Sequence, residues 1–240
     1  MKMKKMIRIY VVMFICLLFS VIPGFAADTS DKSNKPDILD SFKREKNNGV
    51  GRTETGDYLW VEVGDNTNGD LIYVDDGLKF HYFLSEPKNA DLACNLAEFK
   101  AKNVDISFTM YPYYKYGNCS GVSYRLNSLN STFASPGYHV IINSLDDPNT
   151  ISLKFGGVTV IKKQELVISS PSKIRVIANG DSHKVYLNGG LVIDVKDSGE
   201  TEDGYVKTDE GYVGFFAYYD LPTFKDFSLT VIPEMKQPEK

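Results

Sequence analysis

A tyrosine-rich stretch holds the residues of this chain whose types and spacing most directly suggest chemistry. It begins with residues 111–116, at the end of an alternating apolar run at 103–111. Tyr124, Arg125 and Asn127 follow on and just after the next strand-like run, at 121–126. A tyrosine ring can stack on a sugar ring, and arginine and asparagine side chains can hydrogen-bond neighbouring hydroxyls. The stretch therefore predicts a glycan-binding platform; the alternative is a loop packed on the sheet or on a protein partner. The predicted ligand-binding residues are Tyr111, Tyr113, Tyr114, Tyr116, Tyr124, Arg125 and Asn127.

Residue types that carry catalysis are present, but not in the spacings that catalysis needs. The histidines, His81, His139 and His183, are scattered, and none has a metal-ligand spacing. Residues 181–183 include the residue types of a catalytic triad, but neighbours in one turn cannot converge as a triad does. A retaining glycosidase needs two nearby carboxyls, whereas the mid-chain strand offers only Asp105. The sequence favours binding over catalysis and predicts no catalytic residue.

The N-terminus has the features of a secretory signal peptide. Four basic residues precede an apolar run at 9–22, and small residues follow it. We expect a signal peptide at residues 1–26 with cleavage after Ala26; an uncleaved anchor is the alternative. The apolar run is shorter than the roughly 20 residues that a spanning helix needs, so no membrane span is predicted after cleavage. The expected location is secreted or at the cell surface, outside the cytoplasm.

Charge and cysteine content describe the mature chain further. Without the signal peptide it has 23 basic and 31 acidic residues, a net charge of −8. No cluster of lysine and arginine remains, which argues against nucleic acid and anionic membrane surfaces as partners. Cys94 and Cys119 remain in an oxidising compartment, so a disulfide between them is predicted. Two buried free thiols are the alternative.

The elements that position these residues are predicted to be short strands. The strongest pattern lies at 173–195, where Asn179-Gly180 and Asn188-Gly189 fit tight hairpin turns because asparagine and glycine tolerate positive φ. Only residues 86–102 allow a helical alternative. About a dozen strands with regular turns predict an all-β fold, a two-sheet antiparallel β-sandwich of jelly-roll type. The expected organisation is a flexible leader at 27–37, a single jelly-roll domain at 38–232 and a polar tail at 233–240.

Two groups of motifs resemble the concanavalin A-like, laminin G-like (LamG) jelly-roll superfamily. The first group is Asp40-Ser41-Phe42, residues 51–56, Trp60 and residues 76–78, and the second comprises residues 174–179, 185–189, 211–215 and 224–227. The resemblance spans Asp40 to Val231 and is carried by turns, core aromatics and strand starts. It implies the jelly-roll fold. Members of this superfamily include lectins, non-catalytic carbohydrate-binding modules, glycoside hydrolases and adhesion modules, so the fold alone does not choose a function.

Together with the tyrosine platform, the resemblance favours a secreted, non-catalytic, lectin-like carbohydrate-binding module whose partner is a glycan or polysaccharide. One alternative is a hydrolase-like jelly roll, including the keto-disaccharide hydrolase type, although no paired Glu-x-Asp-x-Glu pattern of the family's glucanases occurs here. Another is a cell-surface adhesion or structural protein with a protein partner. The resemblance also implies a structural calcium held by Asp226 on the last strand, with Asp40 as a possible neighbour.

Overall fold

The computed structural model describes residues 35–45, 47–64, 71–81, 91–112, 119–142, 150–197, 199, 205–218 and 220–234. The predicted signal peptide, most of the predicted leader, and Tyr113, Tyr114 and Tyr116 lie outside these residues. The regular secondary structure of the described residues consists of β-strands, without a helix. Accordingly, this part of the chain contains no helix with the length and apolar character to cross a membrane.

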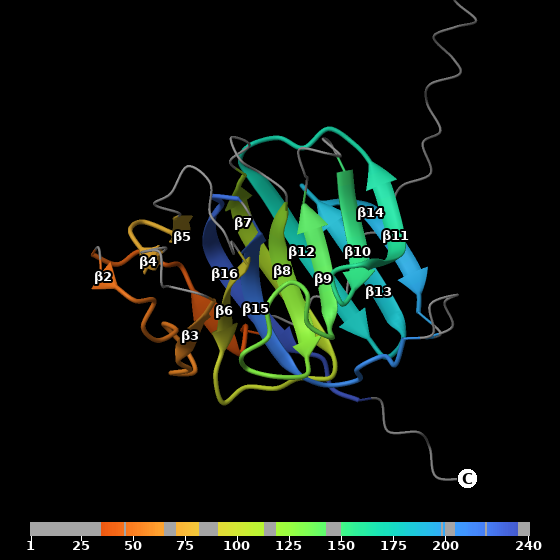
Figure 1. Ribbon diagram of the computed structural model, residues 1–240, viewed down its shortest axis with the longest axis horizontal. Helices are drawn as coiled ribbons and strands as arrows, with labels where there is room; N and C mark the ends of the chain where they lie inside the picture. The colour runs from red at the N-terminus through yellow and green to blue at the C-terminus, as the bar shows by residue number, and fades with distance from the viewer. Residues whose placement is uncertain are drawn as a thin grey trace, which may run out of the picture. The chain divides into compact units, whose positions relative to one another are not determined.

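The strands form two antiparallel sheets (Figure 1). The nine-stranded sheet has the order β14 (Gly190–Lys196), β13 (Ser182–Leu187), β12 (Ser172–Asn179), β7 (Val104–Tyr111), β16 (Thr223–Val231), β5 (Leu78–His81), β4 (Leu71–Val74) and β2 (Asn47–Asn48), with β1 (Ile38–Asp40) also paired to β16. The seven-stranded sheet has the order β11 (Thr159–Glu165), β10 (Thr150–Phe155), β9 (Tyr138–Ile142), β8 (Cys119–Leu126), β15 (Tyr212–Tyr218), β6 (Asp91–Leu96) and β3 (Trp60–Val63).

This architecture confirms the predicted two-sheet antiparallel sandwich. Within residues 86–102, where a helix was the alternative, Asp91–Leu96 forms strand β6. The turn between β13 and β14 also follows the prediction, because Asn188 and Gly189 have φ angles of 50° and 86°.

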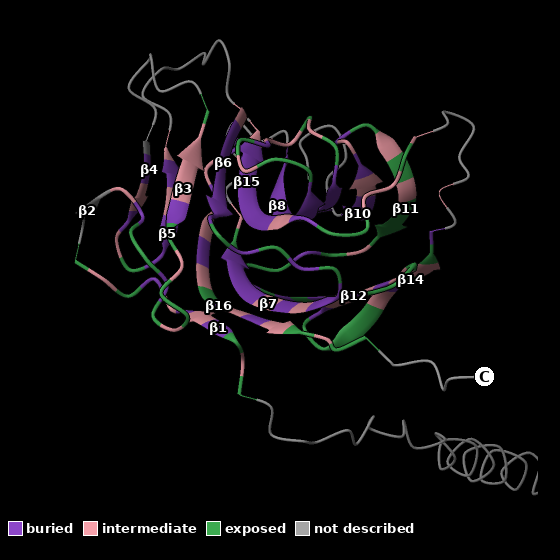
Figure 2. Ribbon diagram, turned by 90° about the horizontal axis from the view of Figure 1, so that it is seen from below, coloured by how far each residue is buried: buried purple, intermediate pink, exposed green. Residues whose placement is uncertain are grey.

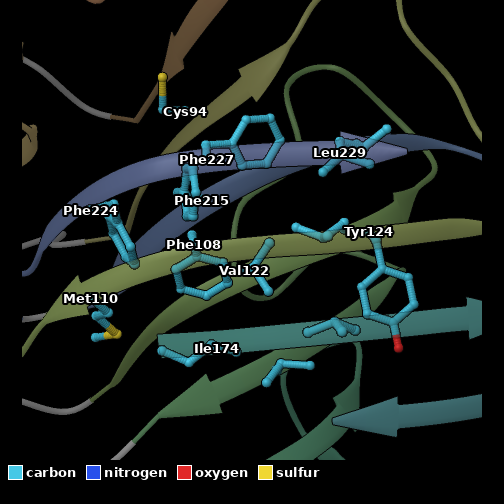
Figure 3. Close-up of a cluster of buried hydrophobic side chains, with 14 of the residues drawn as sticks. Cys94, Phe108, Met110, Val122, Tyr124, Ile174, Phe215, Phe224, Phe227 and Leu229 are labelled. Carbon is cyan, nitrogen blue, oxygen red and sulfur yellow. The ribbon is translucent and has the colours of Figure 1, made fainter. Parts of the chain in front are cut away.

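The core lies between the two layers, and strands of both layers carry many buried residues (Figure 2). Strand β7 illustrates the pattern: its even-numbered residues, from Val104 to Met110, are buried, while Asp105, Ser107 and Tyr111 are not. Aromatic rings from both sheets meet around Phe215 (Figure 3). Its ring centroid lies 4.3 Å from that of Phe224 and 5.2 Å from that of Phe108. The two layers are therefore joined by a continuous apolar core.

Strand β16 breaks the alternation at a β-bulge. The register of its pairing with β7 shifts between Lys225 and Ser228, and Asp226 has a φ of 53°. Phe224 and Phe227 are both fully buried in the core, so the two residues between them share the outer face of the sheet. The bulge thereby turns the Asp226 side chain outward.

The predicted disulfide does not form, because Cys94 and Cys119 are free thiols. Cys94 on β6 and Cys119 on β8 belong to one sheet and are separated by β15, where they pair with Phe215 and Tyr218. Cys94 faces the core between the sheets, beside Phe227 and Phe215 in Figure 3, whereas Cys119 belongs to a cluster on the outer face. Burial raises the pKa of the Cys119 thiol to about 12. The alternative of two buried free thiols holds.

Candidate functional site

A groove lies on the outer face of the nine-stranded sheet, across β7, β12, β13 and β16. Its volume is about 480 Å³. Phe108 and Ile174 also line the groove, but their side chains belong to the core. A ligand in the groove would therefore meet mainly the outward side chains of the other lining residues. We call this surface the groove face. The groove is lined by Ser107, Phe108, Thr109, Lys173, Ile174, Arg175, Tyr186, Gly189 and Asp226.

The floor of the groove is made by the small hydroxyl residues Ser107 and Thr109 on β7. Longer side chains flank them on β12, because Lys173 pairs with Thr109 and Arg175 pairs with Ser107. The Oγ atom of Ser107 lies 2.7 Å from the Oγ atom of Ser228 on β16. Two small residues between longer neighbours leave a hollow with a hydroxyl-lined floor.

Arg175 and Tyr186 form one side of the groove. Nε and Nη2 of Arg175 donate to the two carboxylate oxygens of Asp105 at 2.8 and 2.6 Å. The Arg175 guanidinium carbon lies 5.7 Å from the centroid of the Tyr186 ring, which is opposite it on β13. A bidentate ion pair and a cation–π contact therefore fix the guanidinium and the tyrosine ring relative to each other.

Asp226 and Lys225 form the other side, on the bulge of β16. The Lys225 ammonium donates to Asp76 at 2.7 Å and lies 5.4 Å from the centroid of the Tyr111 ring. This hydrogen bond raises the pKa of Lys225 and lowers that of Asp76. Asp226 is exposed and, within the described residues, its side chain makes no hydrogen bond. Its carboxylate is therefore available to a ligand in the groove.

Of the predicted ligand-binding residues that the structure describes, only Tyr111 lies near this groove. It is the last outward residue of β7 and is 38% exposed. Asn127 follows the C-terminal end of β8, whereas the tyrosine-rich stretch precedes the N-terminal end of β8 in the sequence. The Oδ1 atom of Asn127 accepts a hydrogen bond from the Ser131 hydroxyl at 3.1 Å. An eight-residue strand separates the two ends by about 25 Å. Tyr111 belongs to the nine-stranded sheet, whereas Asn127 follows a strand of the seven-stranded sheet, so the structure does not bring these two residues together.

Tyr124 and Arg125 require a correction, because both are buried. The Tyr124 hydroxyl lies 2.8 Å from Nδ1 of His183, between the two sheets. Arg125 donates from Nε to the carbonyl of Lys102 and from Nη2 to the carbonyl of Gly180, both at 2.8 Å. These side chains hold the interior together and do not reach a surface where a glycan could bind.

The predicted calcium pair also requires a correction, because Asp40 and Asp226 face opposite sides of the sheet. Asp40 on β1 is opposite Phe227 and is fully buried, whereas Asp226 is exposed. The carboxylate of Asp40 accepts from the backbone N–H of Phe42 at 2.9 Å, from Arg44 at 2.6 Å and from the Trp60 indole at 2.8 Å. Its acceptor positions are thus occupied by protein donors, although burial raises its pKa.

Among the described residues, no three acidic, histidine or cysteine side chains are grouped as calcium or another metal would require. The two predicted ligands therefore do not fit a shared calcium ion.

Lys173, Arg175 and Tyr186 are groove residues that the sequence did not single out. They lie in the hairpin that gave the clearest strand pattern, and their alternation with buried residues places them on its outer side. That signal was present in the sequence. What it did not reveal is that β7 lies beside β12 and presents two small hydroxyl residues next to them.

The outer face of the seven-stranded sheet is filled by the chain itself, and we call it the covered face. Its apolar cluster consists of Ala93, Cys119, Ile141 and Phe216. Phe133 stacks on Phe216 with ring centroids 5.2 Å apart. The loop of residues 127–137 that carries Phe133 is held down by Asn95, whose Nδ2 donates to the carbonyls of Leu129 and Ser131, both at 2.8 Å.

No family model and no curated protein sequence matches this chain. Solved structures do resemble it. Carbohydrate-binding module CBM66 from Bacillus subtilis is 16% identical with a TM-score of 0.55, over 71% of this chain and 94% of that one. A beta-glucanase of Bacillus licheniformis is 11% identical with a TM-score of 0.56, over 83% and 100%. The exoplasmic/lumenal domain of VIP36, in a Ca²⁺/Man-bound form, is 11% identical with a TM-score of 0.54, over 75% and 86%.

At these identities the likeness concerns the fold. The chain has a jelly-roll β-sandwich like that of these solved structures.

Proposed function

We propose that this protein is a secreted, non-catalytic carbohydrate-binding module, and that its glycan contacts lie in the groove on the nine-stranded sheet. The observation that carries the proposal is the bulge at Asp226. It directs a carboxylate with no hydrogen-bonding partner among the described residues into a groove that already holds a tyrosine ring and a fixed guanidinium. Bulges often redirect side chains at functional sites.

The groove offers the kinds of contact that sugar recognition uses. The Tyr186 ring provides an apolar surface for the C–H face of a sugar, and Asp226 provides an acceptor for hydroxyl groups. The Lys173 ammonium and the hydroxyls of Ser107 and Thr109 add donors along the floor and rim. A site with an aromatic platform and a few fixed polar groups is typical of small-ligand binding.

The hydrolase alternative has less support from the same groove. Double-displacement hydrolysis of a glycoside needs one carboxyl as proton donor and another as nucleophile. Of the two nearest carboxylates, Asp105 has both oxygens occupied by Arg175, which leaves Asp226 alone. On the covered face, Phe133 and its loop occupy the space above the sheet. The arrangement therefore favours binding without turnover.

We propose that the protein is exported, because of the predicted signal peptide at residues 1–26. We also propose a laminin G-like relationship, because of the motif residues between Asp40 and Val231. A cell-surface adhesion protein remains an alternative, and the binding experiment separates it from a glycan-binding module.

The test is a pull-down and affinity-electrophoresis survey of the mature chain against a panel of polysaccharides, with Tyr186→Ala and Tyr212→Ala as matched variants. Tyr212 also contacts a cation, because the Lys100 ammonium lies 4.8 Å from the centroid of its ring, but it belongs to the seven-stranded sheet. We expect Tyr186→Ala to weaken binding about tenfold, equivalent to about 1.4 kcal/mol, and Tyr212→Ala to leave it unchanged. Absence of binding to every polysaccharide, or unchanged binding by Tyr186→Ala, would overturn the proposal. Release of reducing sugar by the wild-type chain would overturn its non-catalytic part.

A further inference from the structure

We infer that the groove selects a neutral polysaccharide and binds several of its sugar units along strand β7, with Tyr111 as the far contact. This inference rests on the proposed function and specifies the ligand class. It is carried by the charge balance of the groove and by the row of outward residues on β7.

The charges around the groove are balanced pair by pair. Arg175 is neutralised by Asp105 through two hydrogen bonds, and Lys225 is neutralised by Asp76 through one. Lys173 and Asp226 remain, one of each sign, and neither makes a side-chain hydrogen bond in the part of the chain that the structure describes. No excess of positive charge is left to attract an anionic ligand.

This balance disfavours uronic and sulfated glycans. A carboxylate or sulfate bound at Lys173 would lie in the same groove as the Asp226 carboxylate, and like charges repel. A hydroxyl group has the opposite preference, because it donates to Asp226 and accepts from Lys173. A neutral sugar with several hydroxyls can use both residues together.

The row of outward residues on β7 sets the length of the ligand. Asp105, Ser107, Thr109 and Tyr111 follow at two-residue intervals, so the row extends over about 20 Å. That distance exceeds one sugar ring several times. Tyr111 is exposed at the end of the row, where the Lys225 ammonium lies against its ring. A ligand that fills the groove and continues along β7 therefore meets a second tyrosine.

The two tyrosines then have different roles. Tyr186 lies in the groove itself and would contact any bound sugar, whatever its length. Tyr111 does not line the groove and would contact only a ligand long enough to extend past Thr109. Chain-length dependence of affinity is therefore the signature of the arrangement.

The first experiment measures affinity for a neutral polysaccharide, a polyuronate and a sulfated polysaccharide at low and high salt. We expect binding to the neutral polymer only, with less than about a twofold change in affinity with salt. The charge-reversal variant Asp226→Lys gives the groove excess positive charge and should gain polyuronate binding that is lost at high salt. Preference of the wild-type chain for the polyuronate or the sulfated polymer would overturn this inference and leave the proposed function standing.

The second experiment compares Tyr111→Ala with Tyr186→Ala on a length series of oligosaccharides from the neutral polymer. We expect Tyr111→Ala to weaken binding of the long members about fivefold and leave the shortest unchanged, equivalent to about 1 kcal/mol. Tyr186→Ala should weaken all of them. Equal effects of Tyr111→Ala at every length, or no effect at any length, would overturn the inference. If no carbohydrate binds at all, the proposed function itself fails.

Discussion

The outer faces of the two sheets show two different uses of small residues. On the covered face, the cluster that includes Ala93 and Cys119 is roofed by the chain's own loop, with Phe133 stacked on Phe216. On the groove face, Ser107 and Thr109 also leave space between longer neighbours, but no described loop fills it. The same sandwich therefore closes one of its hollows with its own side chain and keeps the other available.

The reason for the difference lies in the hydrogen bonds that each face supplies. Asn95 is fully buried on the covered face and binds two carbonyls of the loop above it, which fixes the loop on the sheet. The groove face uses its polar groups differently, since Arg175 and Lys225 pair with carboxylates at the rim. A face with buried donors aimed at the backbone is structural, whereas a face with paired ions around an empty centre suits a ligand.

The largest effect that distinguishes the faces should be on stability in acid. His139 is buried on the covered face, where Nδ1 lies 2.8 Å from the Ser123 hydroxyl and Nε2 lies 3.1 Å from the Ser135 carbonyl. Burial lowers the pKa of His139 to about 4, and that of His183 between the sheets also to about 4. Below an unfolded pKa of about 6.5 the unfolded chain binds protons that the folded chain does not. The free energy of unfolding should fall as pH drops from about 6.5 to 4, by up to about 3 kcal/mol for each histidine.

Asp220 opposes this trend. Burial raises its pKa to about 6, so the folded chain holds a proton that the unfolded chain has lost. Its contribution to stability falls as pH rises from about 4 to 6. Burial also raises the pKa values of Asp40 and Glu62, which act in the same direction as Asp220 but through smaller shifts, so the net slope should follow the two histidines. Urea denaturation across this pH range measures it, and His139→Asn should flatten the slope. A slope of the opposite sign would contradict the prediction.

Truncation of Phe133 should reduce stability without affecting ligand binding. Phe133→Ala removes a half-buried ring that contacts Phe216, Tyr218 and His139, so we expect a loss of about 2 kcal/mol. For a domain of this size the melting temperature should drop by roughly 4–8 °C. Phe133→Leu is the matched control and should cost less. If Phe133→Ala weakened glycan binding while the protein stayed folded, the covered face and not the groove face would be the binding surface.

A glycine at the bulge should separate stability from binding on the groove face. Asp226 has a φ of 53°, a conformation that favours glycine, so Asp226→Gly should stabilise the fold by up to about 1 kcal/mol. The same variant loses the groove carboxylate and should bind glycans about tenfold more weakly, equivalent to about 1.4 kcal/mol. Asp57→Gly is the matched control, because Asp57 has a φ of 54° and lies outside the groove. An equal loss of binding by both variants would argue against a role for Asp226.

The smallest effect concerns the two thiols. Because Cys94 and Cys119 face opposite sides of their sheet, a reductant should leave the melting temperature unchanged. Alkylation after denaturation without reductant should modify both cysteines of the mature chain, as mass spectrometry would show. A single disulfide-linked species would contradict this arrangement and would require the sheet to rearrange.

Local patterns in the sequence predicted the fold well. Alternation on β7 and the Asn-Gly turn at 188–189 depend on neighbouring residues, which is why they can be recognised without knowing what lies beside them. The pairing of β7 with β12 and β16 joins residues far apart in the sequence, and no local pattern indicates it. The groove arises from that pairing, so its lining could not be predicted.

The incorrect site residues have equally specific causes. Alternation from Phe224 would turn Asp226 inward, and only the bulge places it in the groove. Tyr124 and Arg125 have polar atoms, but their partners in the interior, His183 and the carbonyls of Lys102 and Gly180, come from other parts of the chain. A polar residue type does not indicate exposure when distant segments supply its hydrogen bonds.

The edges of the two sheets have a consequence for how this chain behaves among copies of itself. Edge strands with free backbone groups invite pairing between molecules. Here β2 contains two residues and β3 contains four, while β11 carries Lys162 and Lys163 and lies close to β14 at the other side. Edge strands that are short, that carry charged side chains or that lie close to another strand leave few free backbone groups with which a second molecule could pair. A fold whose regular elements, in the residues that the structure describes, are all strands is thereby protected against edge-to-edge aggregation at high concentration.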